Sequence, residues 1–262
     1  MKNFILWFLA FLITLFTAAY QRLTGPTYPV QGKAHVANCT IMYTLARTHE
    51  THKDYEIKIA ACNPEITGHV LYKRFKTKDP WTQAQMKKTE DSFLIAYLPS
   101  KPPAGKLAYK VILTYKDEEV SLSGENPVII RFKGKVSNSI LIPHIIFIFL
   151  AMLFSTRAGL EALRPQSNPR KLVLWTTALL FVGGMIFGPL VQYSAFGALW
   201  TGFPFGYDLT DNKTFIALIG WVIALIAGHH GKPARKWVLG ASILLLVVFL
   251  IPHSLFGSEL KY

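Results

Sequence analysis

Five long apolar runs divide this chain, and their lengths predict a membrane protein. The first extends from Phe4 to Ala19, and four more cover about residues 139–156, 172–191, 214–227 and 237–251. A helix needs roughly 17–25 mostly apolar residues to cross the hydrocarbon core of a bilayer. Two of the runs fall slightly short of that length, but aromatic and small polar residues extend both. We therefore expect five transmembrane helices.

The first run, within residues 1–20, has two interpretations. Ala18 and Ala19 end it with small side chains, as the cleavage site of a secretory signal peptide requires. The run is also long enough to remain in the membrane. We expect an N-terminal membrane helix that serves either as an anchor or as a signal.

The charges of the short connections predict the orientation of the chain. The connection at 157–171 carries four basic residues against one acid, and the connection at 228–236 carries three basic residues and no acid. Cytoplasmic loops are enriched in Lys and Arg, so both should lie inside. The connection at 192–213 contains two aspartates and should lie outside. This order places residues 21–138 and the C-terminus outside, on the periplasmic side if the membrane is a bacterial inner membrane.

The polar region at residues 21–138 predicts a β domain. Stretches that alternate apolar and polar residues, or are rich in β-branched residues, cover residues 35–45, 55–61, 69–75, 92–98, 106–115 and 127–132. Turn residues separate them, most clearly in the Pro-rich loop at 99–105. About seven short strands in about 100 residues are typical of an immunoglobulin-like sandwich.

These patterns together give the expected fold class. It is an α-helical membrane bundle of five transmembrane helices with an inserted extracytoplasmic all-β immunoglobulin-like sandwich domain. The expected domains are the N-terminal helix at 1–20, the sandwich at 21–138, and a four-helix transmembrane domain at 139–262 with an outer aromatic loop at 192–213.

Cys39 and Cys62 both fall on or beside strands of the expected sandwich. Disulfides form in oxidising outer compartments, which makes a bond between the two cysteines plausible. Strand pairing cannot be derived from the spacing of cysteines. A disulfide and two buried free thiols therefore both stay open.

Composition narrows the range of functions. Charged residues make up 16% of the chain, against about 25% in soluble proteins, and the formal net charge is +13. A basic chain can bind nucleic acid, but these positive residues are dispersed through the polar domain or placed at helix ends, so we exclude nucleic acid as a partner. The chain has no phosphate-binding Gly loop, no Gly-x-Ser-x-Gly elbow and no paired carboxylates in its apolar runs. We therefore do not expect an enzyme.

Three features predict a cofactor site at the outer surface. His144 and His253 each end an Ile-Pro-His element, at the outer ends of the second and fifth expected helices, and the loop at 196–208 between them is rich in Gly and aromatic residues. Neutral imidazole is a common ligand of haem iron, and an aromatic loop can pack against a porphyrin face. Each His alone also fits an interfacial residue after a helix-ending proline, and Trp and Tyr normally collect at membrane interfaces.

The segment from Asp211 to Trp221 resembles the end of the tryptophan-rich outer loop in the haem-handling membrane proteins of cytochrome c biogenesis. It shares with that loop an Asp, Lys, Ala, Leu, Ile and Trp at matching spacing. The family places one outer-facing His before the loop and one after it as axial haem ligands. The resemblance therefore implies that His144 and His253 bind the haem iron, the metal of this site. The candidate cofactor-binding residues of the loop are Trp200, Phe203, Phe205, Asp208 and Asp211.

Two functions follow as expectations. The first is an integral membrane haem-binding or haem-handling protein with an outer bis-His site, whose β domain docks a protein partner such as a cytochrome. The second is a non-catalytic accessory or assembly subunit of a larger respiratory or transport complex in the membrane. In both cases membrane lipid surrounds the helices.

Overall fold

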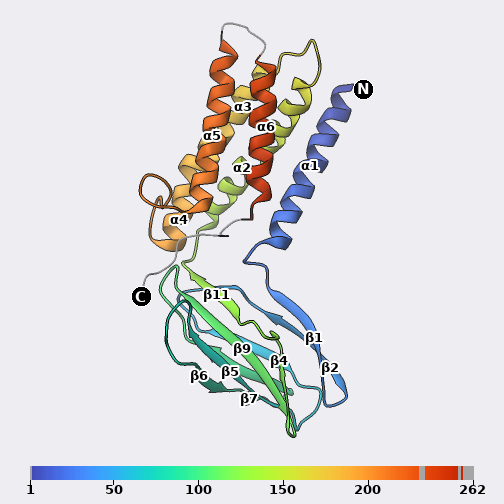
Figure 1. Cartoon of the computed structure of the whole chain (residues 1–262), viewed down its shortest axis with the longest axis vertical. Coiled ribbons are helices and arrows are strands. Elements are labelled where there is room, and N and C mark those ends of the chain that lie inside the picture. Colours follow the sequence, from blue (N-terminus) through green and yellow to red (C-terminus); the bar gives the residue numbers. More distant parts are fainter. Residues whose placement is uncertain (1, 230–233, 253–254, 256–262) are drawn as a thin grey trace. The chain divides into compact units, whose positions relative to one another are not determined.

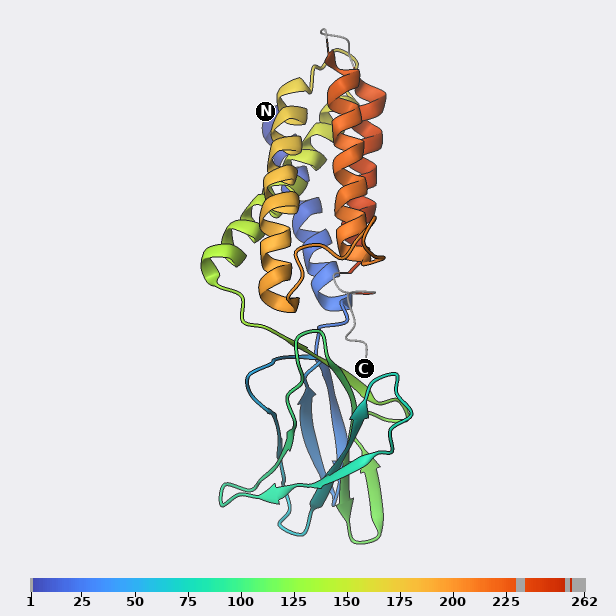
Figure 2. The same cartoon turned by 90° about the vertical axis from the view of Figure 1, so that its left-hand side faces the viewer.

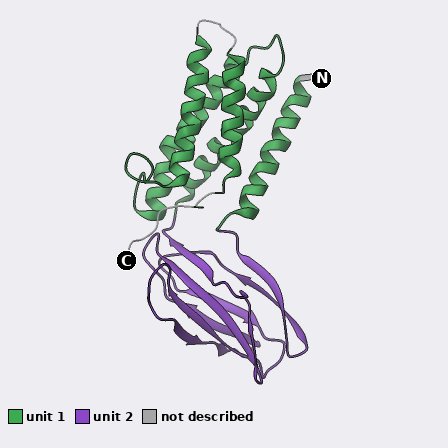
Figure 3. Cartoon of the chain, viewed as in Figure 1, with its two compact units in different colours: residues 1–26, 136–258 green, residues 27–135, 259–262 purple. Residues whose placement is uncertain are grey.

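The computed structural model describes residues 2–229, 234–252 and 255, which fall into two compact units (Figure 1). The helical unit contains the described residues up to Pro26 and from Val136 onward, and the β unit extends from Thr27 to Lys135 (Figure 3). The chain leaves the helical unit after its first helix and returns to it at residue 136.

The helical unit consists of α-helices and one π-helical segment. Its elements are α1 (Lys2–Thr24), α2 (Asn138–Ala162), α3 (Arg170–Phe181), the π-helix η1 (Val182–Phe187), α4 (Gly188–Phe196), α5 (Leu209–Ala227) and α6 (Arg235–Leu250). The elements α3, η1 and α4 follow one another without a break and form one long helix. Figure 1 and Figure 2 show the helices of this unit side by side, with their long axes roughly aligned.

The prediction of five transmembrane helices with an inserted sandwich is wrong. Four helices of the described chain are long and apolar enough to cross a membrane, namely Asn3–Thr24, Asn138–Ala162, Arg170–Phe196 and Leu209–Ala227. The fifth expected crossing is α6, whose 16 residues rise about 24 Å, less than the about 30 Å of a hydrocarbon core. The sheets lie N-terminal to α2 and to every helix that follows it.

The length of α6 is limited at its C-terminal end by a proline. A residue before proline is pushed out of the α region by contact with the proline ring. Ile251 precedes Pro252 and is extended, with a ψ angle of 117°. The aromatic and small polar residues that flank this run do not lengthen the helix as the sequence predicts, because the helix ends at Leu250.

A buried apolar core joins α2, α3, α5 and α6. Its members with at most 1% of their surface exposed include Ala151, Leu180, Ala217, Trp221 and Leu245. Small residues bring α2 and α6 together, because the hydroxyl of Ser242 donates to the carbonyl of Ser155 at 2.9 Å. A Cβ atom on the neighbouring Gly159 would collide with Ser242. Close contacts through small residues are typical of helix packing in membranes.

The β unit contains eleven strands in its described chain. They are β1 (Val30–Val36), β2 (Cys39–Leu45), β3 (Thr48–Glu50), β4 (Tyr55–Ala60), β5 (Thr67–Arg74), β6 (Thr82–Gln85), β7 (Lys87–Lys88), β8 (Phe93–Leu98), β9 (Lys106–Tyr115), β10 (Glu118–Ser121) and β11 (Val128–Lys133).

The strands form three sheets, so the expected two-sheet immunoglobulin-like sandwich is not the observed arrangement. One sheet is the hairpin of β1 and β2, and a second has the order β4-β8-β7. The third has the order β3-β11-β9-β5-β6, with β10 paired to β9. β3 runs parallel to β11, and the other pairs are antiparallel. Alternation along the sequence predicts strands, but it does not predict which strands pair.

The long strand β9 supplies much of the core of the β unit. Its side chains with at most 1% exposure recur at every second residue, namely Leu107, Tyr109, Val111 and Leu113. The Tyr109 hydroxyl donates to the carbonyl of Ala46 at 2.8 Å, and the amide of Ala46 donates to the Tyr55 hydroxyl at 3.0 Å. Burial raises the pKa of both phenols. The two tyrosine hydroxyls therefore provide hydrogen-bond partners for both the N–H and the C=O group of Ala46, which lies between β2 and β3.

The structure pairs Cys39 with Cys62 in a disulfide. Cys39 is the first residue of β2, and Cys62 lies two residues beyond the end of β4. The bond therefore links the β1–β2 hairpin to the three-stranded sheet.

Candidate functional site

The loop at 197–208 joins α4 to α5 and begins and ends in defined caps. Gly197 ends α4 with a positive φ of 80°, a conformation that glycine adopts without strain. At the other end, the Asp208 carboxylate accepts a hydrogen bond from the amide of Thr210 at 2.8 Å. Asp208 is thus the N-cap of α5.

A second carboxylate, on Asp211, holds the middle of the loop against α4 and α5. Its Oδ2 atom accepts from the Thr201 amide at 2.7 Å and from the Gln192 side chain at 3.1 Å. The Thr201 hydroxyl lies within hydrogen-bond distance of both Asp208 and Asp211. Asp211 is only 7% exposed. This carboxyl group holds the loop in place, because it supplies an acceptor to donors that would otherwise be buried without a partner.

The next turn of the loop is fixed by Asn212 and Trp200. The Asn212 side chain accepts from the amide of Phe203 at 2.7 Å, and the Trp200 indole donates to the carbonyl of Phe203 at 3.0 Å. Gly202 lies between them, where a Cβ atom would come within 2.6 Å of the Asp211 side chain. Only glycine lets the loop approach α5 this closely.

A buried lysine on α5 reaches the end of α6. Lys213 is 4% exposed, and its ammonium group donates to the carbonyl of Ile251 at 2.6 Å. The Gln21 amide of α1 donates to the carbonyls of Phe249 and Ile251, at 2.8 and 3.3 Å. The last carbonyls of a helix lack intrahelical partners, and a cation there also interacts favourably with the helix dipole. Three helices therefore meet at these carbonyls.

The loop holds three aromatic side chains out of the protein. Phe203 is 67% exposed, Phe205 82% and Tyr207 94%. Trp200 behaves differently, because its ring packs edge-on against Phe215 of α5 at 6.3 Å and its N–H group is used within the loop. The side chains of Asp208, Asp211 and Asn212 hold the backbone of the loop. The three exposed rings take no part in these contacts.

His144 lies on α2 and faces the π-helical segment. Its Nδ1 atom is 2.9 Å from the carbonyl of Gly183, and a Cβ atom on Gly188 would lie 3.8 Å from its ring. The amide of Gly188 donates to the same Gly183 carbonyl, five residues back. A carbonyl oxygen only accepts, so Nδ1 donates its proton to it and Nε2 keeps its lone pair. Within the described part of the chain, Nε2 makes no hydrogen bond.

The structure brings together only part of the predicted site. Asp208, Asp211, Trp200 and Phe203 take part in one hydrogen-bond network of the loop and the start of α5, whereas the Phe205 ring extends away from it and is exposed. The two aspartates hold the loop itself. His144 lies on α2 with its ring against the carbonyl of Gly183, and His253 lies outside the described residues.

No group of three or more His, Cys, Asp or Glu side chains suited to a metal ion occurs among the residues that the structure describes. The prediction also missed Gln192 and Lys213, which complete the polar network of the loop and the helix ends. A signal for both was present, because each directly borders an apolar run, and polar or charged residues at membrane depth are costly and usually have a defined role.

Comparison of the sequence with models of known protein families gave no match, and comparison with curated proteins gave none either. The functional argument therefore depends on the geometry of the chain itself.

Proposed function

We propose that this chain is a non-catalytic, membrane-anchored accessory subunit that binds a protein partner through the aromatic loop at 197–208. The observation that carries the proposal is the contrast within this loop. Buried carboxylates fix its backbone, while Phe203, Phe205 and Tyr207 are 67–94% exposed.

A fixed loop with exposed rings is well suited to binding. Aromatic side chains offer a large contact area and lose little conformational entropy when they are immobilised. A loop that already has its bound conformation also avoids the cost of ordering its backbone. Aromatic residues are enriched among the few side chains that dominate the energy of an interface.

Removal of the three rings tests the proposal. We expect the triple variant Phe203→Ser, Phe205→Ser, Tyr207→Ser to bind its partner at least about tenfold more weakly, since a single hot-spot ring contributes about 2 kcal/mol or more. The measurement is quantitative mass spectrometry of proteins that co-purify with the full chain from its native membrane in mild detergent. Tyr193→Ser is the matched control, because Tyr193 is 58% exposed on α4 and lies outside the loop.

Two results would contradict the proposal. One is the recovery of the same partners, in the same amounts, with the triple variant. The other is a wild-type chain that purifies without any stoichiometric partner. Either result would leave the rings as an interfacial aromatic belt, where such side chains also collect.

The orientation of His144 favours a second candidate function, the binding of haem. Histidines that bind metals usually donate their other ring N–H to a carbonyl or carboxylate, which fixes the ring and its tautomer. The contact between His144 and Gly183 has this form and leaves Nε2 for a ligand. We propose His144 as one axial ligand and His253 as the other, as the resemblance to the cytochrome c biogenesis proteins implies.

An absorption spectrum tests this candidate directly. We expect the full chain, purified from haem-replete cells, to show a Soret band that His144→Ala abolishes. His52→Ala is the control, because His52 is exposed in the β unit and should leave the band unchanged. A wild-type chain without a Soret band would rule out haem.

A further inference from the structure

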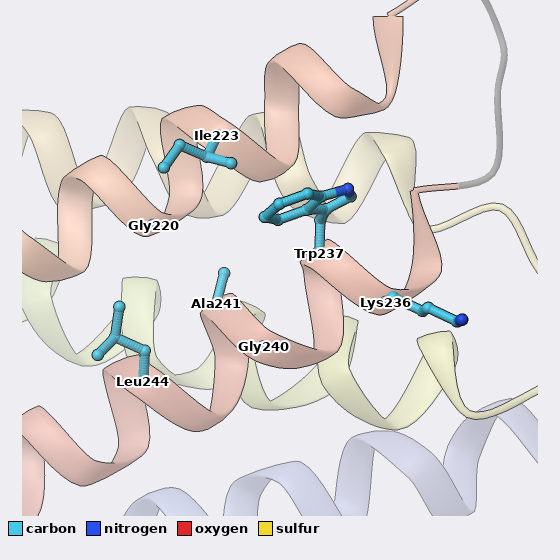
Figure 4. Close-up of a pocket in the computed structure, with 7 residues that line it drawn as sticks. All are labelled: Gly220, Ile223, Lys236, Trp237, Gly240, Ala241 and Leu244. Atoms are coloured by element: carbon cyan, nitrogen blue, oxygen red, sulfur yellow. The ribbon is translucent and has the colours of Figure 1, made fainter.

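An apolar groove lies between α5 and α6 on the surface of the helical unit (Figure 4). Its volume is about 510 Å³, within the range of about 300–1,000 Å³ that is usual for small-molecule sites. The lining residues come from both helices and are mostly apolar: Gly220, Ile223, Lys236, Trp237, Gly240, Ala241 and Leu244.

The floor of the groove contains a glycine that internal packing does not require. A Cβ atom on Gly240 would meet no other atom within 4 Å, so the space above it is open. Gly220 differs, because a Cβ atom there would collide with Leu244. Glycine in a helix interior costs about 1 kcal/mol relative to alanine. No close contact within the described chain requires glycine at position 240, but the absence of a side chain there deepens the groove.

One end of the groove is basic and interfacial in character. Lys236 and Trp237 stand at the start of α6, and Figure 4 shows the Trp237 ring extending from α6 toward α5. Both side chains are exposed, and Trp237 is 58% exposed. The adjacent Arg235 is already engaged, since it donates to the carbonyls of Ala162 and Pro165 at 2.8 and 3.0 Å.

Lys236 is therefore the cation that this end of the groove offers to a ligand. Within the described residues, no ion pair of Lys236 is formed. The N-terminal end of α6 adds a partial positive charge, because the first amides of a helix point outward from its end. An anion is favoured at this end, and an apolar chain is favoured along the rest of the groove.

We propose that the groove binds one anionic phospholipid, with an acyl chain against Gly240 and Ala241 and its phosphate beside Lys236. Basic sites between membrane helices on the cytoplasmic side characteristically hold anionic head groups. The loop charges predict that the start of α6 lies on that side. An uncharged partner helix would fill the apolar part of the groove but would leave the ammonium group without a counter-charge.

Native mass spectrometry of the full chain with added lipid tests the proposal. The probes are dioleoyl phosphatidylglycerol and dioleoyl phosphatidylcholine, which have the same acyl chains but different net charge. We expect phosphatidylglycerol to bind about fivefold more tightly, as one lysine near an anionic head group provides. Lys236→Gln should remove this preference. Lys171→Gln, which removes an exposed cation at the start of α3, should retain it.

A second pair of variants tests the apolar part of the groove. Gly240→Leu should lower the binding of both lipids by about tenfold, because it fills the space that the acyl chain occupies. Gly240→Ala should give an intermediate loss, and both residues are better helix formers than glycine. Ala178→Leu is the control, because Ala178 is exposed on α3 outside the groove.

Several outcomes would overturn the proposal. Equal binding of the two lipids by the wild-type chain would exclude a charged head-group site. Unchanged lipid binding by Gly240→Leu would place the lipid elsewhere. Displacement of phosphatidylglycerol by millimolar inorganic phosphate would show that the site recognises free phosphate. A wild-type dimer that Gly240→Leu dissociates would show that a second copy of the chain fills the groove. None of these outcomes bears on the loop at 197–208.

Discussion

Replacing Asp211 with alanine should lower the free energy of unfolding of the helical unit by about 2–5 kcal/mol, because it leaves buried hydrogen-bond donors without their acceptor. Asp211 accepts hydrogen bonds from the Thr201 amide and the Gln192 side chain, and it lies beside the Thr201 hydroxyl. Alanine would leave these donors without their acceptor in a buried place, and each orphaned group costs about 1–3 kcal/mol. Titration of the purified chain with sodium dodecyl sulfate, followed by far-UV circular dichroism, measures the loss.

Two further variants separate the role of this carboxylate from a general effect of charge removal. Asp211→Asn keeps one acceptor oxygen and should lose less than half as much stability as Asp211→Ala. Asp117→Ala removes an exposed carboxylate in the β unit and should leave the helical unit unchanged. In Asp211→Ala, protease should cut the 197–208 loop faster, because the loop is no longer fixed. Equal stability of Asp211→Ala and the wild type would mean that the hydrogen bonds at Thr201 do not hold the loop.

Loss of the bond between Cys39 and Cys62 should destabilise the β unit by about 3 kcal/mol. The sequence separation of the two cysteines is 23, and a loop of that size gives about 3 kcal/mol from chain entropy alone. The variant to use is Cys39→Ala with Cys62→Ala, which removes the bond and leaves no free thiol. Hydrogen exchange of the full chain in detergent, read in peptides from β2, β4 and β9, measures the change in opening free energy.

Reduction of the wild-type chain supplies the control for this change. Protein treated with dithiothreitol should exchange like the double variant, and untreated protein should take up no thiol-alkylating label under denaturing conditions. Alkylation of both cysteines without prior reduction would show that the two thiols are free. The β1–β2 hairpin should respond most strongly, because the bond links it to the sheet that contains β4.

The sequence predicted helices and strands correctly where a long apolar run or a long alternation of apolar and polar residues marked them. Unbroken apolar runs gave the positions of α1, α2 and α5, because crossing a bilayer requires length and apolarity together. Alternation gave strands such as β9, in which every second side chain faces the core. The predicted number of crossings is wrong at α6, because the apolar run there is short and Pro252 prevents the helix from continuing.

Other features depended on contacts between distant residues and left no local signal. The parallel pairing of β3 with β11 joins residues about 80 positions apart in the chain, which alternation cannot reveal. Of the predicted site, Asp208 and Asp211 were expected to bind a cofactor, and their observed hydrogen bonds hold the loop. Gln192 and Lys213 were overlooked because each was counted only as an end of the outer loop at 192–213.

The π-helical segment η1 determines which way the end of the long helix faces. A π turn holds one residue more than an α turn, so every side chain after it is rotated by about 100° relative to an uninterrupted helix. Gln192 follows η1 by five residues and points at Asp211 only with that rotation in place. Deleting a single residue from Val182–Phe187 would restore a regular helix and turn the Gln192 amide away from the loop. The extra residue of η1 therefore sets the rotation of α4, and this rotation directs Gln192 toward Asp211 and the loop that Asp211 holds.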